Sequence, residues 1–160
     1  MGHRTDRISL AGRAGFSLLE LVLVVAVLAI VAAIAAPRYA NTLANQRLEA
    51  AARRIVADLA LAQRQAKFSG TSQTVSFDAS KSSYRLAGVQ KLDRSAGDYT
   101  VALAGEPYQV SIVSASFGAD AEIIYDGYGV PDSGGTVTIQ AGGYQMVITV
   151  DADTGRASGS

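Results

Sequence analysis

The order of apolar and polar positions divides the chain into four segments with different patterns. They are a basic leader (1–15), an apolar segment (16–36), an amphipathic stem (37–69) and a glycine-rich head (70–160). The apolar segment and the stem predict one long helix with a transmembrane half and an amphipathic half, and the head predicts strands joined by turns. The predicted fold is therefore α+β, with the long amino-terminal helix packed on an antiparallel β-sheet head.

The apolar segment is long enough to cross a membrane once. Residues 21–36 are sixteen consecutive apolar residues, and only Ser17 and Glu20 interrupt the run that begins at Phe16. At about 1.5 Å per residue, a helix over 16–36 spans roughly 30 Å, the thickness of the hydrocarbon core of a bilayer. Because short basic segments stay on the cytoplasmic side, the leader predicts a cytoplasmic amino terminus and a head outside the membrane.

The stem has the spacing of an amphipathic helix. Its apolar positions alternate between steps of four and three, at Leu48, Ala52, Ile55, Leu59, Ala62 and Ala66. Charged side chains are predicted on its other faces, at Arg47, Arg53, Arg54, Asp58, Arg64 and Lys67. Gly70 is a plausible helix stop, so the pattern predicts one continuous helix over 17–69, about 80 Å long.

The head has the alternation typical of strands. Apolar residues recur with a period of two at Val75 and Phe77, Tyr84 and Leu86, Val110 and Ile112, and Tyr144, Met146, Ile148 and Val150. Further strands are predicted over 121–126 and 136–140, and a short one over 100–103. The glycines and Pro131 between these runs predict turns.

The side-chain inventory excludes several kinds of chemistry. The chain has no cysteine, which excludes disulfides, thiolate metal sites and cysteine nucleophiles. Its one histidine, His3, lies in the leader, so no Ser-His-Asp triad is expected in the rest of the chain. We predict no enzymatic activity and no cofactor.

Two groups of residues in the head resemble ligand sites only weakly. Asp151 and Asp153 alternate like the first ligands of a calcium loop, but the bidentate glutamate of such a loop is missing. Gly127, Gly129 and residues 134–135 lack the helix and the Lys-Ser/Thr pair that follow a phosphate-binding loop. We therefore interpret both groups as turns and predict no metal site.

Three interpretations compete for the junction between the leader and the apolar segment. A secretory signal would use Ala33-Ile34-Ala35 as its cleavage site, and a plain membrane anchor would not be cleaved. Neither accounts for the sequence 15–20, or for Glu20 in an apolar segment, where an acid costs about 2–3 kcal/mol near the membrane centre. The third interpretation uses all of these residues.

Gly15-Phe16-Ser17-Leu18-Leu19-Glu20, after a basic leader and before an apolar helix, resembles the processing motif of type IV pilins and type II secretion pseudopilins. The resemblance implies that a prepilin peptidase cleaves between Gly15 and Phe16 and methylates the new amino terminus of Phe16. It also implies that Glu20 pairs with the amino terminus of a neighbouring subunit during assembly. Pro37 matches the proline that kinks the helix of such proteins.

The carboxyl-terminal half is similar to the GspH/FimT family of minor pseudopilins. The residues that carry this similarity are 124–131, 135–139, 144–150 and Gly155-Arg156. The resemblance implies a minor pseudopilin of a type II secretion system, anchored in the inner membrane with a periplasmic head and assembled with other pseudopilins. The alternatives are a FimT-like minor type IV pilin, structural or binding DNA, and, from another class, a secreted ligand-binding β domain.

Charge is distributed unevenly, although the chain as a whole has no net charge. Residues 38–69 carry six basic and two acidic side chains, whereas residues 70–160 carry five basic and ten acidic ones. DNA binding needs clustered lysine and arginine, so the acidic head argues against nucleic acid as a partner. We regard a solvated helix face as the simpler interpretation of the basic stem. A second hypothesis places Arg53 and Arg54 against the acidic head of the next subunit.

Overall fold

The computed structural model describes residues 16–90 and 98–160, without the side chains of residues 36, 37, 40 and 90. The predictions for Gly15, His3 and the rest of the leader lie outside the described residues. The chain divides into two compact units, Met1–Tyr39 and Ala40–Ser160. The first contains the apolar half of the helix, and the second contains the stem from Ala40 onward and the head.

Helix α1 extends from Leu18 to Ser69, within one residue of the predicted bounds. Within the second unit, all six apolar positions predicted from the spacing of the stem are buried. The helix ends at Gly70, which has a φ of +64° and donates its N–H to the carbonyl of Ala66 at 2.9 Å. This left-handed conformation favours glycine, so the predicted stop is confirmed.

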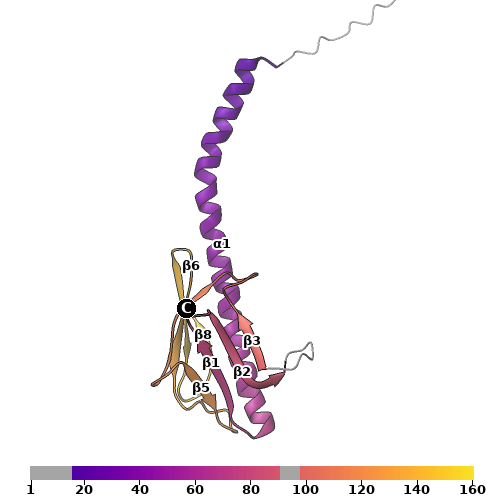
Figure 1. Ribbon diagram of the computed structural model, residues 1–160. Helices are drawn as coiled ribbons and strands as arrows, with labels where there is room; N and C mark the ends of the chain where they lie inside the picture. Colours follow the sequence, from indigo (N-terminus) through magenta and orange to yellow (C-terminus); the bar gives the residue numbers. More distant parts are fainter. Residues whose placement is uncertain (1–15, 91–97) are drawn as a thin grey trace, which may run out of the picture. The chain divides into compact units, whose positions relative to one another are not determined.

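The head consists of two four-stranded antiparallel sheets (Figure 1). The first sheet has the order β3-β2-β1-β5, with the strands β1 Gln73–Asp78, β2 Ser83–Gln90, β3 Asp98–Ala102 and β5 Glu122–Tyr125. The second has the order β4-β6-β7-β8, with the strands β4 Ser111–Phe117, β6 Gly135–Ala141, β7 Tyr144–Val150 and β8 Ala157–Gly159. The predicted α+β, pilin-like fold is confirmed. The sequence did not predict that the strands divide between two sheets.

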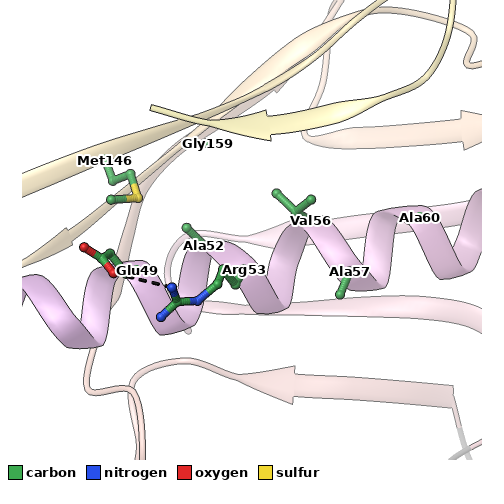
Figure 2. A pocket seen from close by; sticks show the side chains of 8 residues that line it. All are labelled: Glu49, Ala52, Arg53, Val56, Ala57, Ala60, Met146 and Gly159. Atoms are coloured by element: carbon green, nitrogen blue, oxygen red, sulfur yellow. Dashed lines mark hydrogen bonds and ion pairs between the residues drawn. The ribbon is translucent and has the colours of Figure 1, made fainter.

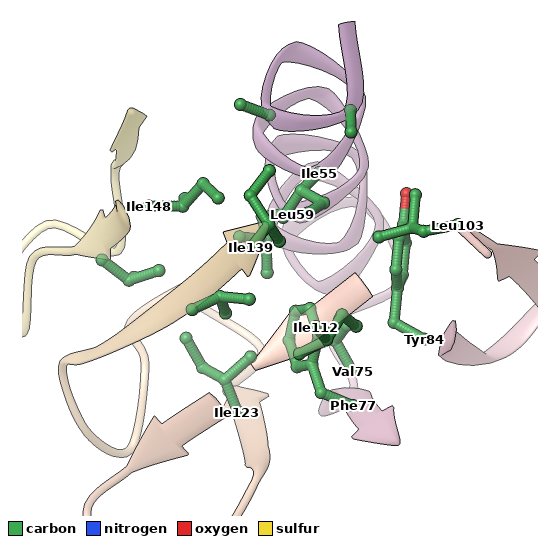
Figure 3. Close-up of a cluster of buried hydrophobic side chains, with 14 of the residues drawn as sticks. Ile55, Leu59, Val75, Phe77, Tyr84, Leu103, Ile112, Ile123, Ile139 and Ile148 are labelled. Atoms are coloured by element: carbon green, nitrogen blue, oxygen red, sulfur yellow. The ribbon is translucent and has the colours of Figure 1, made fainter. Parts of the chain in front are cut away.

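The core lies where the stem and both sheets meet (Figure 3). Ile55 and Leu59 of α1 are buried together with strand residues of both sheets. An aromatic contact joins the sheets: the ring of Phe77 in β1 lies 5.5 Å from that of Phe117 in β4. The second unit therefore has a single core. Each strand buries one apolar face in it, and the helix buries one apolar stripe.

Strand β8 was not predicted from the sequence. It is three residues long, and its burial does not alternate, so it gives no periodic signal. Its place is fixed by pairing with β7, with Val150 opposite Ala157 and Ile148 opposite Gly159. The short predicted strand over 100–103 is confirmed as part of β3.

Candidate functional site

The first candidate site is the exposed apolar half of α1. Leu18–Ala35 is a stretch of 18 helical residues with a mean hydropathy of 3.0, and none of it is buried. Such a helix satisfies its own backbone hydrogen bonds, so it can enter a bilayer without exposing them to hydrocarbon. By length and composition, this segment can cross a membrane, and its apolar side chains are free to contact lipid or other helices.

Glu20 and Phe16 lie close together at the start of this helix. The carbonyl of Ser17 accepts the N–H of Leu21 at 3.1 Å, which makes Ser17 the capping residue and leaves Phe16 just outside the helix. Glu20 lies in the first turn, where the positive end of the helix dipole favours a carboxylate. Within the described residues, Glu20 forms no ion pair.

The sequence from Ser17 to Glu20 also has the form of a capping box, in which a glutamate three residues after the cap bonds back to the helix start. Sequence reasoning missed this pattern, although Ser-x-x-Glu before an apolar run is its known signature. Glu20 therefore has two candidate roles: a local one at the helix terminus, and pairing with a neighbouring subunit.

The helix assignment continues through Pro37. The predicted kink at this residue therefore stays a prediction. The peptide bond between Gly15 and Phe16 is only half described, because Gly15 lies outside the described residues, so the cleavage site also stays a prediction.

The second feature is a buried carboxylate that joins the stem to the head. Asp58 Oδ2 accepts hydrogen bonds from Tyr84 Oη at 2.6 Å, Tyr99 Oη at 3.4 Å and Arg54 Nε at 3.0 Å. The Arg54 guanidinium carbon also lies 5.7 Å from the centre of the Tyr99 ring. These contacts connect α1 to β2 and β3, and the charged and hydrogen-bonding donors compensate the cost of burying Asp58.

This cluster corrects one sequence-based expectation and adds an intramolecular contact to a second, which stays a hypothesis. Asp58 was predicted on a face of the stem away from the core, but it is buried because two phenols of the head reach it. Arg54 was proposed to contact the next subunit, yet its guanidinium pairs with Asp58 within the same chain. Of the two arginines in that hypothesis, Arg53 is the exposed one, and it pairs with Glu49 at 3.5 Å.

Two donors of the cluster, Tyr84 and Arg54, stay protonated at neutral pH. Burial raises the pKa of the Tyr84 phenol well above its usual range, and the hydrogen bond to the Asp58 carboxylate raises it further. Partial burial lowers the pKa of Arg54, but the attraction to Asp58, Tyr84 and Tyr108 and the hydrogen bond to Asp58 together outweigh it, so the net shift is upward. The arrangement therefore fixes the head on the stem, and the Tyr84 hydroxyl is not poised for proton transfer.

The glycine-containing turns of the head close onto the protein itself. Gln63 Nε2 donates to the carbonyls of Gly129 and Thr154, both at 2.8 Å, and so ties two loops to α1. A Cβ at Gly127 would lie 2.6 Å from the Gly70 carbonyl oxygen, so this glycine is needed for close packing. The interpretation as turns is confirmed for Gly127 and Gly129, whereas Gly135 is the first residue of strand β6.

The loop after β7 is likewise closed by internal hydrogen bonds. Asp151 Oδ1 accepts the N–H of Asp153 at 3.2 Å, and both the N–H and the hydroxyl of Thr154 at 2.8 and 2.7 Å. The bonds from Thr154 lower the pKa of the Asp151 carboxyl. No group of three or more potential metal-ligating side chains occurs among the described residues. This loop is an aspartate-capped turn.

Comparisons with known proteins match both parts of the chain. The family model described as type II transport protein GspH matches residues 51–154, more than half of the chain. The model of the prokaryotic N-terminal methylation motif matches residues 10–36. No curated protein matches the chain significantly. No solved structure does so either.

Proposed function

Because the chain belongs to the GspH family of type II transport proteins, we propose that it is a minor pseudopilin of a type II secretion system. The observation that carries the proposal is an exposed apolar helix with an acidic residue in its first turn, in a chain that also contains a GspH head with its own core. The methylation motif and this helix support a membrane-anchored pseudopilin. Its role is structural, and its partners are the membrane, the prepilin peptidase, other pseudopilins and the secretion machinery.

The first step of the proposal is processing of the precursor. The prepilin peptidase cleaves between Gly15 and Phe16 on the cytoplasmic side and methylates the amino group of Phe16. The methylation motif matches residues on both sides of this bond. In addition, Phe16 precedes the helix and is 79% exposed, so its backbone is not held in helical hydrogen bonds.

Mass spectrometry of the mature amino terminus tests this step. The expected result is a chain that starts at N-methylated Phe16. A chain that starts at Ala36 would show a cleaved secretory signal, and a chain that keeps Met1 would show an unprocessed anchor. Either result would contradict the pseudopilin proposal.

The second step is assembly, in which Glu20 sets the register between subunits. A carboxylate in hydrocarbon needs a partner, and within the described residues Glu20 has no ion pair. The amino group released at Phe16 of a neighbouring subunit supplies a positive charge. The apolar helices then bundle together, and the heads form the periplasmic surface of the filament.

The substitution Glu20→Gln separates assembly from helix capping. Glutamine can still serve in a capping box, but it has no negative charge to pair with an amino group. We expect E20Q to be cleaved and methylated like the native chain, yet to be recovered in the membrane and not in sheared filaments. Ser17→Ala is the matched control: it removes the cap but keeps Glu20, and it should still assemble.

Two outcomes would contradict the role of Glu20. If E20Q enters filaments at the native level, the charge is not needed for assembly. If S17A fails to assemble as completely as E20Q does, the requirement lies in the helix terminus. The mature mass is measured in every variant, so that a failure of processing is not mistaken for a failure of assembly.

A further inference from the structure

A groove runs between the stem and the edge of the second sheet. Two adjoining hollows of about 420 and 510 Å³ form it, and they share Val56 and Ala60 on α1. The first hollow is also lined by Met146 and Gly159, as Figure 2 shows. The second continues toward Arg64 and the start of β8. The groove therefore follows β8 on one side and about four turns of α1 on the other.

Strand β8 presents unpaired main-chain groups along its outer edge. Val147 and Ser160 exchange both of their N–H···O=C bonds, at 3.1 and 3.0 Å. In an antiparallel pair, bonded positions alternate, so Ala157 and Gly159 direct their N–H and C=O groups away from β7. This edge offers donors and acceptors with the spacing that another strand needs.

The edge strand β5 of the first sheet is closed, in contrast to the edge of β8. At β5, the Ile124 carbonyl accepts the N–H of Asp132 at 2.9 Å, and its N–H donates to Asp132 Oδ1 at 3.0 Å. One aspartate thus occupies both main-chain groups of the edge residue. In the described part of the chain, no side chain hydrogen-bonds to Ala157 or Gly159 in this way.

The size and surface of the groove suit an extended polypeptide. The stem side is built from small and apolar side chains, those of Ala52, Val56, Ala57 and Ala60. Between Glu49 and Arg64 the helix rises about 22 Å. A strand of six or seven residues has this length, at about 3.3 Å per residue. Such a strand could bond to β8 and bury alternate side chains against α1.

The charges beside the groove are predominantly basic. Arg64 and Arg156 line the second hollow, which has no acidic lining residue. Neither arginine forms an ion pair with any residue of the described ranges. Arg53, beside the first hollow, has only the exposed contact with Glu49. A segment with acidic side chains on its outward positions would complement them.

We propose that this groove accepts an extended acidic segment of a neighbouring subunit, which adds a fifth strand beside β8. A phosphate backbone fits less well, because the edge of β8 offers carbonyl acceptors that phosphate cannot satisfy. That the partner is a subunit of the filament rests on the proposed function. The strand-binding groove itself does not, since it depends only on α1 and β8.

The test measures binding of a labelled peptide to the full chain in detergent micelles, by fluorescence polarisation. The probe is a hexapeptide of alternating aspartate and valine, and its counterpart alternates lysine and valine. Gly159→Pro removes the outward N–H of this position without removing a bond to β7. Gly159→Ala is the matched control: it keeps the N–H, and its Cβ would make an ordinary 3.7 Å contact with Ala52.

We expect the aspartate peptide to bind the native chain and the G159A variant alike, and to bind G159P about fivefold more weakly. Arg64→Glu with Arg156→Glu should weaken binding about tenfold and reduce its dependence on salt. Hydrogen exchange at residues 157 and 159 should slow when the peptide is bound, a readout that needs no variant.

Three results would overturn the proposal: no binding of the aspartate peptide, equal binding of the lysine peptide, or equal binding by the native chain and G159P with no slowing of exchange. Displacement of the peptide by a single-stranded oligonucleotide at lower concentration would instead assign the groove to nucleic acid. Because the assay contains no filament, its result is independent of the tests of processing and of Glu20.

Discussion

At the scale of single residues, Asp58 is the side chain that most directly attaches the head to the stem. It accepts hydrogen bonds from two phenols of the first sheet and from Arg54, and it is 5% exposed. Removing the charge of a buried carboxylate leaves its donors without an equivalent acceptor. The stability of the head should therefore depend on this position far more than on the surface charges of the same helix.

We expect Asp58→Asn to lower the free energy of unfolding of the head by about 2–4 kcal/mol. The chain has no tryptophan, so urea unfolding is followed by the near-ultraviolet circular dichroism of its tyrosines. Glu49→Gln is the control, because it breaks an exposed pair that is worth less than about 1 kcal/mol. A loss in D58N no larger than the loss in E49Q would contradict the role of the cluster.

The titration of Tyr125 makes the stability of the head depend on pH in the alkaline range. Burial raises its pKa from 10.0 to about 12, and its hydroxyl donates to the Gly155 carbonyl at 3.3 Å. The unfolded chain releases this proton first, so the contribution to stability is complete below about pH 10 and is lost as the pH rises towards 12. Burial of Tyr84 acts in the same direction.

The substitution Tyr125→Phe should therefore flatten the fall in stability between pH 10 and 12, while Tyr84 preserves part of it. At pH 7, the variant should be less stable by about 0.5–1.5 kcal/mol, through the lost hydrogen bond. Denaturant midpoints measured at intervals across this range provide the comparison. A fall as steep as that of the native chain would mean that Tyr125 does not titrate in the expected way.

At the scale of elements, α1 serves as the support to which the loops of the head are tied. Its apolar stripe is buried beneath both sheets, and Gln63 reaches from the helix to two loops far away in the sequence. The second of these loops contributes Gly155 to the second hollow of the groove, which Gln63 also lines. The position of the groove wall thus depends on hydrogen bonds from one helical side chain.

We predict that Gln63→Ala costs about 1–3 kcal/mol, because two loop carbonyls lose their donor. Hydrogen exchange should accelerate in residues 126–131 and 151–156 and stay unchanged in β1. Gln46→Ala is the control, since Gln46 is exposed on the same helix. Equal exchange rates in the two variants would show that the loops hold their positions without Gln63.

At the scale of the whole molecule, the chain consists of a unit with a core and a unit in which none of the described side chains is buried. The buried hydrophobic residues of the described chain begin at Leu48, whereas the helix before Ala36 is exposed throughout. This division follows from the pattern of each half. An amphipathic helix buries one face against a head, and a helix that is apolar on all sides needs lipid or other helices.

The second unit should therefore fold by itself. We expect residues 40–160, produced as a soluble fragment, to unfold at the same urea concentration as the head in the full chain in detergent micelles. Near-ultraviolet circular dichroism reports both transitions. A midpoint lowered by more than about 1 M in the fragment would show that the apolar half contributes to the stability of the head.

The periodic elements were predictable from sequence, because periodicity reports burial directly. The spacing of the stem identified the buried positions of α1, and alternation identified β1, β2, β6 and β7. The motif from Gly15 to Glu20 could also be recognised in the sequence. An acidic residue in an apolar helix is costly unless it has a partner, so its presence indicates a function. The GspH and methylation matches confirm the family that these patterns indicated.

Only the tertiary structure decided which surfaces meet. Asp58 is spaced like a surface residue of the stem, and nothing near it in sequence reveals that Tyr84 and Tyr99 will reach it. Strand β8 forms through its hydrogen bonds with β7. The groove lies where β8, the last strand of the sheet, runs beside α1. The sequence determined the elements, which depend on neighbours a few residues apart. Pairings across long separations depend on how these elements pack, and they appear only in the folded chain.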